Sequence, residues 1–146
     1  DPRFTIAETP DLLVDGVLGN PSASANGQWF GYWERHASFF LFFSNAIRPE
    51  SVNLNLIQNT YNNIFPPSRI EVWGGPDKDH LLLLGKNTPE IPQTGSSGKY
   101  LQEEVKLKTD SVKCLKVVAY PLPALPYWHP QKNRPGRMFL SEIIIN

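Results

Sequence analysis

Near its carboxyl end the sequence reads Tyr127-Trp128-His129-Pro130, then Arg134-Pro135-Gly136, and then Met138-Phe139-Leu140-Ser141-Glu142-Ile143-Ile144-Ile145. The first two segments have the aromatic, polar and proline-rich composition of a loop, and the third has the apolar composition of a strand. Loops carry recognition more often than the strands that support them, so a binding surface is expected to meet the core at this join. Glu142 stands among aliphatic residues, and a buried carboxylate needs a partner or a metal ion.

Short β-rich runs of the same kind recur along the chain. The 14 prolines and 10 glycines interrupt every helical window, and only one helical turn is expected, starting at Thr9 as N-cap. Strands are expected over residues 39–43 (as a buried strand), 51–57, 68–73, 81–84, 101–107, 112–118 and 138–145. This succession of short strands and turn signals predicts an all-β fold, an antiparallel β-sandwich of the jelly-roll kind.

Composition limits the classes of partner. The 14 Lys and Arg residues balance the 14 Asp and Glu residues, which argues against nucleic-acid binding and against a polybasic membrane-surface protein. No run of about 18 apolar residues is present, so no membrane insertion is expected. The single cysteine, Cys114, is expected to pack in the core as a small apolar residue. The sequence starts with Asp1 and not with methionine, so either a leader was removed or the chain is a fragment. We favour the fragment and expect residues 1–146 to be a single module excised from a larger protein.

No catalytic motif stands out. The three histidines, His36, His80 and His129, are not spaced as metal ligands on one element, and neither a nucleophile elbow nor a phosphate-binding loop occurs. The adjacent Glu103 and Glu104 would point to opposite faces of a strand, which makes them a poor acid pair. A pair of acids from distant loops stays open, but the expectation is that the module is not an enzyme.

Aromatic residues gather in three segments that we expect to lie outside the strands. Planar polar side chains accompany them, a combination suited to sugars, because an aromatic ring stacks on the C–H face of a pyranose while polar groups bind its hydroxyls. The alternative is that these rings fill the ends of the sandwich, which we favour for Trp29. For His129 the alternative is a hydrogen bond within its own loop. The aromatic residues of the three segments are Trp29, Phe30, Tyr32, Trp33, Tyr61, Phe65, Tyr127 and Trp128.

The loop at residues 13–20, together with Glu142, has the composition of a site for a hard cation. Leu13-Val14-Asp15-Gly16 followed by Gly19-Asn20 has the composition of a tight loop with free carbonyl groups, and calcium prefers carboxylate and carbonyl oxygens of this kind. A strand glutamate such as Glu142 would complete the ligand set. The alternatives are an N-cap or an Asx-turn for Asp15 and a salt bridge for Glu142.

These pieces resemble a known family. Leu13-Val14-Asp15-Gly16, then Trp29-Phe30-Gly31-Tyr32 and an apolar strand at 39–43 are similar to segments of galactose-binding-like jelly rolls. This group includes the discoidin or coagulation-factor C-type domains and the carbohydrate-binding modules of family thirty-two. Residues 67–73 and 128–143 extend the resemblance over nearly the whole chain, and the last segment resembles versions appended to secreted bacterial glycosidases.

The resemblance implies a galactose-binding-domain-like fold and a non-catalytic carbohydrate-binding module that targets an attached domain to glycans. Its partners would be a glycan and covalently linked domains, and its location would be extracellular, periplasmic or at a bacterial cell surface. A protein–protein or structural spacer module on the same fold is the alternative, because family members bind varied partners through their loops. The ligand-binding residues that the resemblance implies are Tyr32, Trp33, Glu34, His36, Asn59, Tyr61, Trp128 and His129, and the implied ligands of a structural calcium are Asp15, Asn20 and Glu142.

Overall fold

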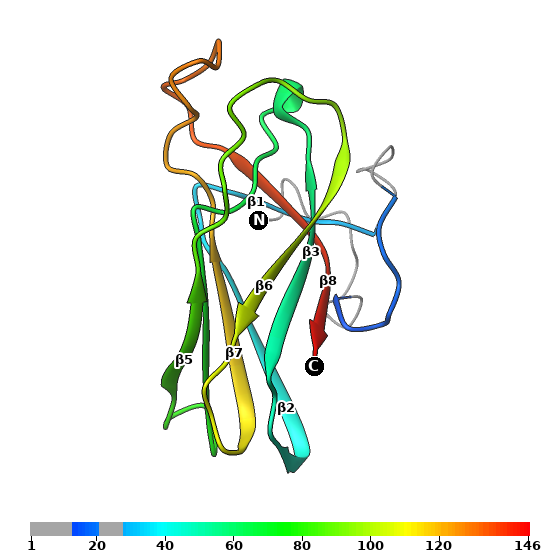
Figure 1. The fold of residues 1–146 in the computed structure, drawn as a ribbon, viewed down its shortest axis with the longest axis vertical. Helices are drawn as coiled ribbons and strands as arrows, with labels where there is room; N and C mark the ends of the chain where they lie inside the picture. The colour runs from blue at the N-terminus through cyan, green and yellow to red at the C-terminus, as the bar shows by residue number, and fades with distance from the viewer. Residues whose placement is uncertain (1–12, 21–27) are drawn as a thin grey trace.

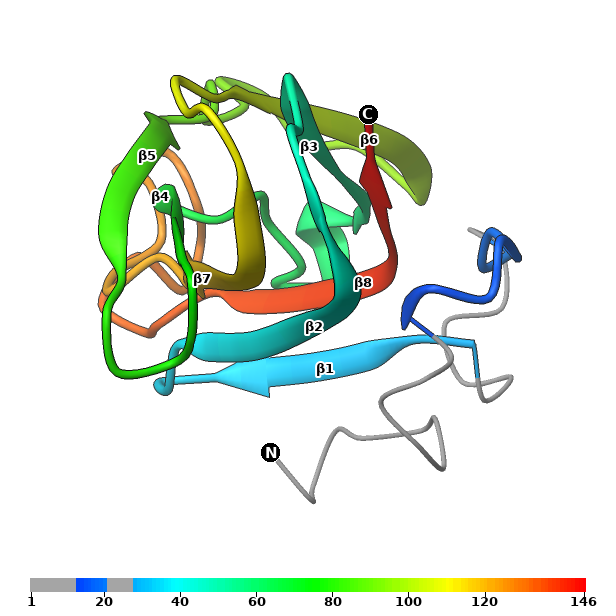
Figure 2. The same ribbon diagram turned by 90° about the horizontal axis from the view of Figure 1, so that it is seen from below.

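The computed structural model describes residues 13–20 and 28–146, and it shows an antiparallel β-sandwich of two four-stranded sheets (Figures 1 and 2). The predicted fold class is confirmed. Residues 9–12, where the helical turn was expected to begin, lie outside the described residues. One sheet has the order β1-β8-β3-β6 and the other has the order β2-β7-β4-β5. The strands are β1 (Phe30–Trp33), β2 (Ala37–Ile47), β3 (Ser51–Gln58), β4 (Arg69–Gly75), β5 (Leu82–Asn87), β6 (Lys99–Lys106), β7 (Val112–Tyr120) and β8 (Arg137–Ile145).

All seven predicted strands are present, and β1 is the strand that sequence patterning missed. Its four residues, Phe30–Trp33, were assigned to an aromatic loop segment because a run this short shows no clear alternation. The core lies between the two sheets and is built from inward residues of both, such as Leu54 and Leu140 from one sheet and Val72 and Val117 from the other. No helix among the described residues has the length and apolarity that crossing a bilayer requires.

A bulge in β8 decides where Glu142 points. Asn55 of β3 pairs with Glu142, but the next residue, Leu56, pairs with Leu140, so Ser141 is the extra residue. Strict alternation from Leu140 would send Glu142 into the core. The bulge instead leaves Leu140 and Ile143 both in the core, and Glu142 lies on the outer side of the sheet, beneath the loop that contains Gly16.

The strand β2 differs from its prediction in burial. Residues 39–43 were expected to form a buried strand, and the strand is present, but Phe40 is 45% exposed and Phe42 is 66% exposed. The expectation of burial was wrong because β2 is an edge strand whose alternate side chains point away from the core. Phe39 and Leu41 face the core, while the rings of Phe40 and Phe42 stack on each other outside it.

The turn between β4 and β5 contains an exposed ion pair that predicts a measurable pH effect. His80 Nδ1 lies 2.7 Å from Asp77 Oδ1, and this contact raises the pKa of His80 and lowers that of Asp77. The pair therefore favours the folded turn between these two pKa values, and its contribution disappears as the pH rises through the raised pKa of His80. In an NMR titration, the His80 pKa is expected to fall toward its ordinary value in Asp77→Asn. An unchanged His80 pKa in that variant would contradict the pairing.

Candidate functional site

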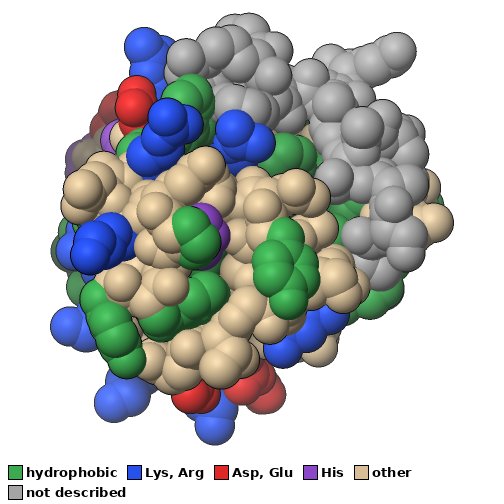
Figure 3. All heavy atoms as spheres, turned by 90° about the horizontal axis from the view of Figure 1, so that it is seen from above, with side chains coloured by type: hydrophobic (Ala, Val, Ile, Leu, Met, Phe, Trp, Pro, Cys, Tyr) green, Lys and Arg blue, Asp and Glu red, His purple; other side chains and the backbone are tan. Residues whose placement is uncertain are grey.

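Three segments meet at one end of the sandwich, at the top of Figure 1: the short 3-10 helix η2 (Thr60–Asn62), the loop 88–98 and the loop 121–136. Seen from above, apolar side chains lie among uncharged polar and backbone atoms, with Lys and Arg mostly toward the rim (Figure 3). A hollow of about 210 Å³, which we call the loop hollow, opens here, lined by Thr60, Tyr61, Asn63, Trp128, His129, Pro130 and Gln131.

His129 braces the loop hollow from inside. Its Nε2 lies 2.9 Å from the carbonyl oxygen of Thr60, and its Nδ1 lies 3.0 Å from the backbone nitrogen of Gln131. Since Nδ1 accepts from Gln131 N–H, Nε2 carries the proton and donates to Thr60. The side chain is only 7% exposed. His129, which was predicted to contact the ligand, thus lines the hollow, but both of its ring nitrogens already have protein partners.

Trp128 ties two of the loops together. Its indole Nε1–H donates to the carbonyl oxygen of Pro92 in the loop 88–98, at 3.0 Å. Its ring centroid lies 6.2 Å from that of Phe65, which is buried beneath it. The half-buried ring is therefore held in a fixed orientation while its remaining surface lines the hollow.

Tyr61 presents the largest free aromatic surface at the hollow. It is 73% exposed, and its ring lies so close to Gly95 that a Cβ added there would be 2.9 Å from Tyr61 Cε1. Asn63 adopts a left-handed backbone conformation and donates its amide Nδ2–H to Gln131 Oε1 at 2.6 Å. This bond leaves the Gln131 amide N–H groups and the Asn63 carbonyl oxygen as further donors and acceptors. Asn63 and Gln131 were absent from the predicted site, although both stand near aromatic residues in the sequence.

The other predicted ligand residues lie elsewhere. Tyr32 packs toward the core with its ring edge-on to Phe39, and burial raises its pKa. Trp33 lies beside the guanidinium group of Arg137, with 5.8 Å between that group's central carbon and the ring centroid.

The remaining three candidates also stay outside the lining of the hollow. Glu34 is exposed in the β1–β2 turn with a positive φ of 65°, and the ring of His36 lies 5.5 Å from that of Tyr120. Asn59 precedes η2, and its buried Oδ1 has no hydrogen-bond donor among the described residues. A ligand role for these residues, and for Tyr32 and Trp33, stays a prediction.

The predicted metal ligands Asp15 and Glu142 come together from opposite ends of the chain. Glu142 Oε1 accepts a hydrogen bond from Gly16 N at 3.1 Å, and Asp15 Oδ1 accepts one from Val17 N at 2.8 Å. Burial raises the pKa of Glu142, and the Asp15 carboxylate raises it further. Asn20, the third predicted ligand, contacts Trp29, whose indole N–H donates to the backbone carbonyl oxygen of Asn20 at 3.1 Å.

This arrangement fits a hard cation. Glu142 Oε2 is buried and has no hydrogen-bond donor within residues 13–20 and 28–146. Two neighbouring carboxylates with an unsatisfied oxygen, beside a loop rich in backbone carbonyls, supply the ligand types that calcium prefers. In that same part of the chain no group of three or more His, Cys, Asp or Glu side chains is arranged to hold a metal ion, so backbone and amide oxygens would have to complete the site.

A second opening runs along β2 on the side of the sandwich. It has a volume of about 660 Å³ and a mainly apolar lining that includes Leu13, Val14 and Ile143 together with residues 38–43. It lies where β8 extends past β1, since β1 pairs only with residues 137–140 of β8. We call it the β2 groove.

No protein-family model and no curated protein matches the sequence. Solved structures do match. The C-terminal domain of a chitobiase from Bacteroides fragilis aligns over 96% of this chain and 80% of its own, with a TM-score of 0.57 and 11% identity. The CBM32 domain of AlyQ, solved with 4,5-unsaturated mannuronic acid, aligns over 94% and 84%, with a TM-score of 0.55 and 12% identity.

A third match is CBM32-5 of a Clostridium perfringens protein, solved with GalNAc-β-1,3-galactose. It aligns over 95% of this chain and 89% of its own, with a TM-score of 0.55 and 13% identity. Sequence identity this low carries the fold and not the ligand. The chain therefore has the same β-sandwich fold as these solved domains, two of which are CBM32 domains.

Proposed function

We propose that this chain is a non-catalytic carbohydrate-binding module that brings a covalently attached domain to a glycan. The observation that carries the proposal is the loop hollow, where the exposed ring of Tyr61 and the fixed ring of Trp128 lie beside the amide side chains of Asn63 and Gln131. The fold supports it, because structures with this fold have been solved with sugars bound. A location outside the cytoplasm of a bacterium, at the cell surface or in the periplasm, is part of the same proposal.

In this proposal each lining residue has a distinct task. Tyr61 stacks on the C–H face of a sugar ring, and the Trp128 ring supplies a second apolar part of the lining. Gln131 and Asn63 bind hydroxyl groups. His129 positions the loop instead of contacting the sugar, because both of its ring nitrogens are engaged by the backbone. Binding at one such shallow site is expected to be weak, since it buries little of the ligand.

The test is to compare Tyr61→Ala with wild type on a glycan array and then by calorimetry with the best glycan found. Removal of the stacking ring is expected to weaken binding about tenfold, roughly 1.4 kcal/mol. Tyr127→Ala is the matched control, because Tyr127 is 83% exposed but does not line the hollow. Equal affinity in Tyr61→Ala and wild type would overturn the assignment of the site.

We also propose that Asp15 and Glu142 hold a structural calcium ion with oxygens of the loop that contains Asn20. The support is the unsatisfied oxygen of Glu142 next to a second carboxylate. A bound cation would join the first described loop to the last strand. It would have no part in recognition, because these residues do not line the loop hollow.

Contact with a linked protein domain is the alternative function, and the β2 groove favours it. Its lining is mainly apolar, and exposed apolar surface of this kind is typical of interaction sites. A glycan array without any positive glycan, together with a Tyr61→Ala variant that behaves like wild type, would favour this alternative over the proposed function.

A further inference from the structure

The outer face of the sheet β2-β7-β4-β5 carries aromatic and basic residues that the proposed function does not use. On β7, Leu115, Val117 and Ala119 belong to the core, so the alternate residues Lys116 and Tyr120 point outward. The register places Phe40 of β2 and Trp73 of β4 on either side of Lys116. We call this surface the sheet platform and define it by Phe40, Glu71, Trp73, Lys86, Lys116 and Tyr120.

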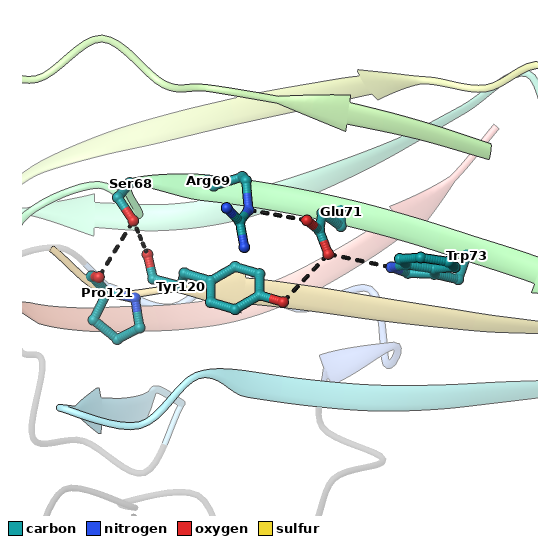
Figure 4. A network of polar contacts seen from close by, with 6 residues as sticks. All are labelled: Ser68, Arg69, Glu71, Trp73, Tyr120 and Pro121. Carbon is teal, nitrogen blue, oxygen red and sulfur yellow. Dashed lines mark hydrogen bonds and ion pairs between the residues drawn. The ribbon is translucent and has the colours of Figure 1, made fainter. Parts of the chain in front are cut away.

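Glu71 fixes the aromatic rings of the sheet platform (Figure 4). Its Oε2 accepts hydrogen bonds from the Tyr120 hydroxyl at 3.2 Å and from the Trp73 indole N–H at 3.3 Å. Its Oε1 lies 2.9 Å from Arg69 Nε, and the guanidinium group of Arg69 covers the Tyr120 ring at 4.2 Å. The carboxylate is therefore balanced by Arg69 and satisfied by neutral donors, and the two rings have little freedom to rotate.

The two lysines give the sheet platform a positive charge. Lys86 lies opposite Glu71 in the β4–β5 register, and Lys116 Nζ lies 5.5 Å from the Phe40 ring centroid. Within the described part of the chain neither lysine is in an ion pair. With Arg69 and Glu71 cancelling each other, the net charge of this surface comes from Lys86 and Lys116.

We propose that the sheet platform is a second glycan-binding surface and that it takes an acidic polysaccharide, whose sugars carry carboxylate or sulfate groups. The rings of Phe40 and Trp73 suit sugar rings, and the lysines suit the acidic substituents. The Tyr120 ring is covered by Arg69, so its part is to hold Glu71 in place. The charge also disfavours a second copy of this chain, because a symmetric contact would bring the same lysines together. The surface lies on a sheet face and shares no residue with the loop hollow, so it is distinct from the site of the proposed function.

The test measures calorimetric dissociation constants for oligogalacturonate, a heparin oligosaccharide and a neutral malto-oligosaccharide of equal length. The double variant Lys86→Gln with Lys116→Gln, and separately Phe40→Ala, are expected to weaken binding of an acidic chain about tenfold. Phe40 is already 45% exposed, so its replacement leaves the core intact. Oligogalacturonate and heparin distinguish carboxylate from sulfate recognition, and binding is expected to weaken as salt rises from about 0.05 to 0.5 M.

The matched control removes two lysines from the other sheet, Lys99→Gln with Lys106→Gln on β6, and is expected to bind like wild type. An equal loss in this control, or equal binding of the neutral chain, would overturn the proposal. So would sedimentation showing that Phe40→Ala converts a dimer to a monomer while no acidic glycan binds. Tyr61→Ala separates the two sites, because it is expected to affect the loop hollow and leave acidic-chain binding unchanged.

Discussion

Calcium is expected to raise the melting temperature of this protein by roughly 5 to 10 °C over its value in EDTA. A ligand at about 100 times its dissociation constant stabilises the folded state by about 2.7 kcal/mol, and about 1 kcal/mol shifts the melting temperature of a domain of this size by 2–4 °C. The physical reason is that a cation would satisfy Glu142 Oε2 and offset the repulsion between Glu142 and Asp15. Differential scanning calorimetry measures the shift.

The variant Glu142→Gln sharpens this test. It is expected to lose the calcium response and, in EDTA at neutral pH, to be at least as stable as wild type, because it removes a buried charge that lies beside another carboxylate. Glu104→Gln, in an exposed position of β6, is the control and should keep the full response. A wild-type melting temperature that is the same in calcium and in EDTA would contradict the site, as would a calcium response retained by Glu142→Gln.

Replacing Trp29 with alanine is expected to lower the free energy of unfolding by about 3–5 kcal/mol, the usual cost of deleting a fully buried tryptophan. Trp29 has no exposed surface and packs with Ile57, Ile64 and Phe139 in a second cluster outside the main core. Its indole N–H also holds the loop through Asn20 O, and Gly19 lies directly against its ring. The substitution therefore leaves a cavity and frees the loop that carries Asp15.

Urea denaturation followed by fluorescence measures this loss, and Tyr127→Ala, an exposed aromatic of the loop 121–136, should change stability by less than about 0.5 kcal/mol. A second expected effect separates the loop from the cavity: Trp29→Ala should also weaken calcium binding, since Asn20 loses its anchor. A loss below about 1 kcal/mol in Trp29→Ala would show that this cluster is not a significant part of the folded core.

Most of the strands were predictable because apolar and polar residues alternate along them. The seven strands predicted from the sequence all appear in the structure at the expected positions. The order of strands was not predictable in the same way. Among the strands formed by residues 28–146, only β4 and β5 are neighbours both in the sequence and in a sheet, and each of the other pairings there joins strands that are distant in the chain. Alternation reveals which face of a strand is buried, but it carries no information about the partner strand.

Part of the candidate site was predictable from the composition of short segments. Aromatic residues among polar ones marked Tyr61 and Trp128, and these two do line one hollow. The segment with Tyr32 and Trp33 shows the same composition, yet β1 is a strand and sends successive side chains to opposite faces. Composition alone cannot separate a loop that presents rings to solvent from a short edge strand that divides them between core and surface.

The bulge at Ser141 also has a consequence for recognising related chains. It changes the spacing of core residues in the last strand from two to three, between Leu140 and Ile143, and this change is visible in the sequence. Loss of the bulge with Ser141 retained would turn Glu142 inward, where a carboxylate has no place, whereas deletion of Ser141 would restore the spacing of two and leave Glu142 on the outer side of the sheet. A three-residue spacing of core positions in the last strand is therefore a marker, visible in the sequence, of the bulge that places Glu142 beneath the first loop.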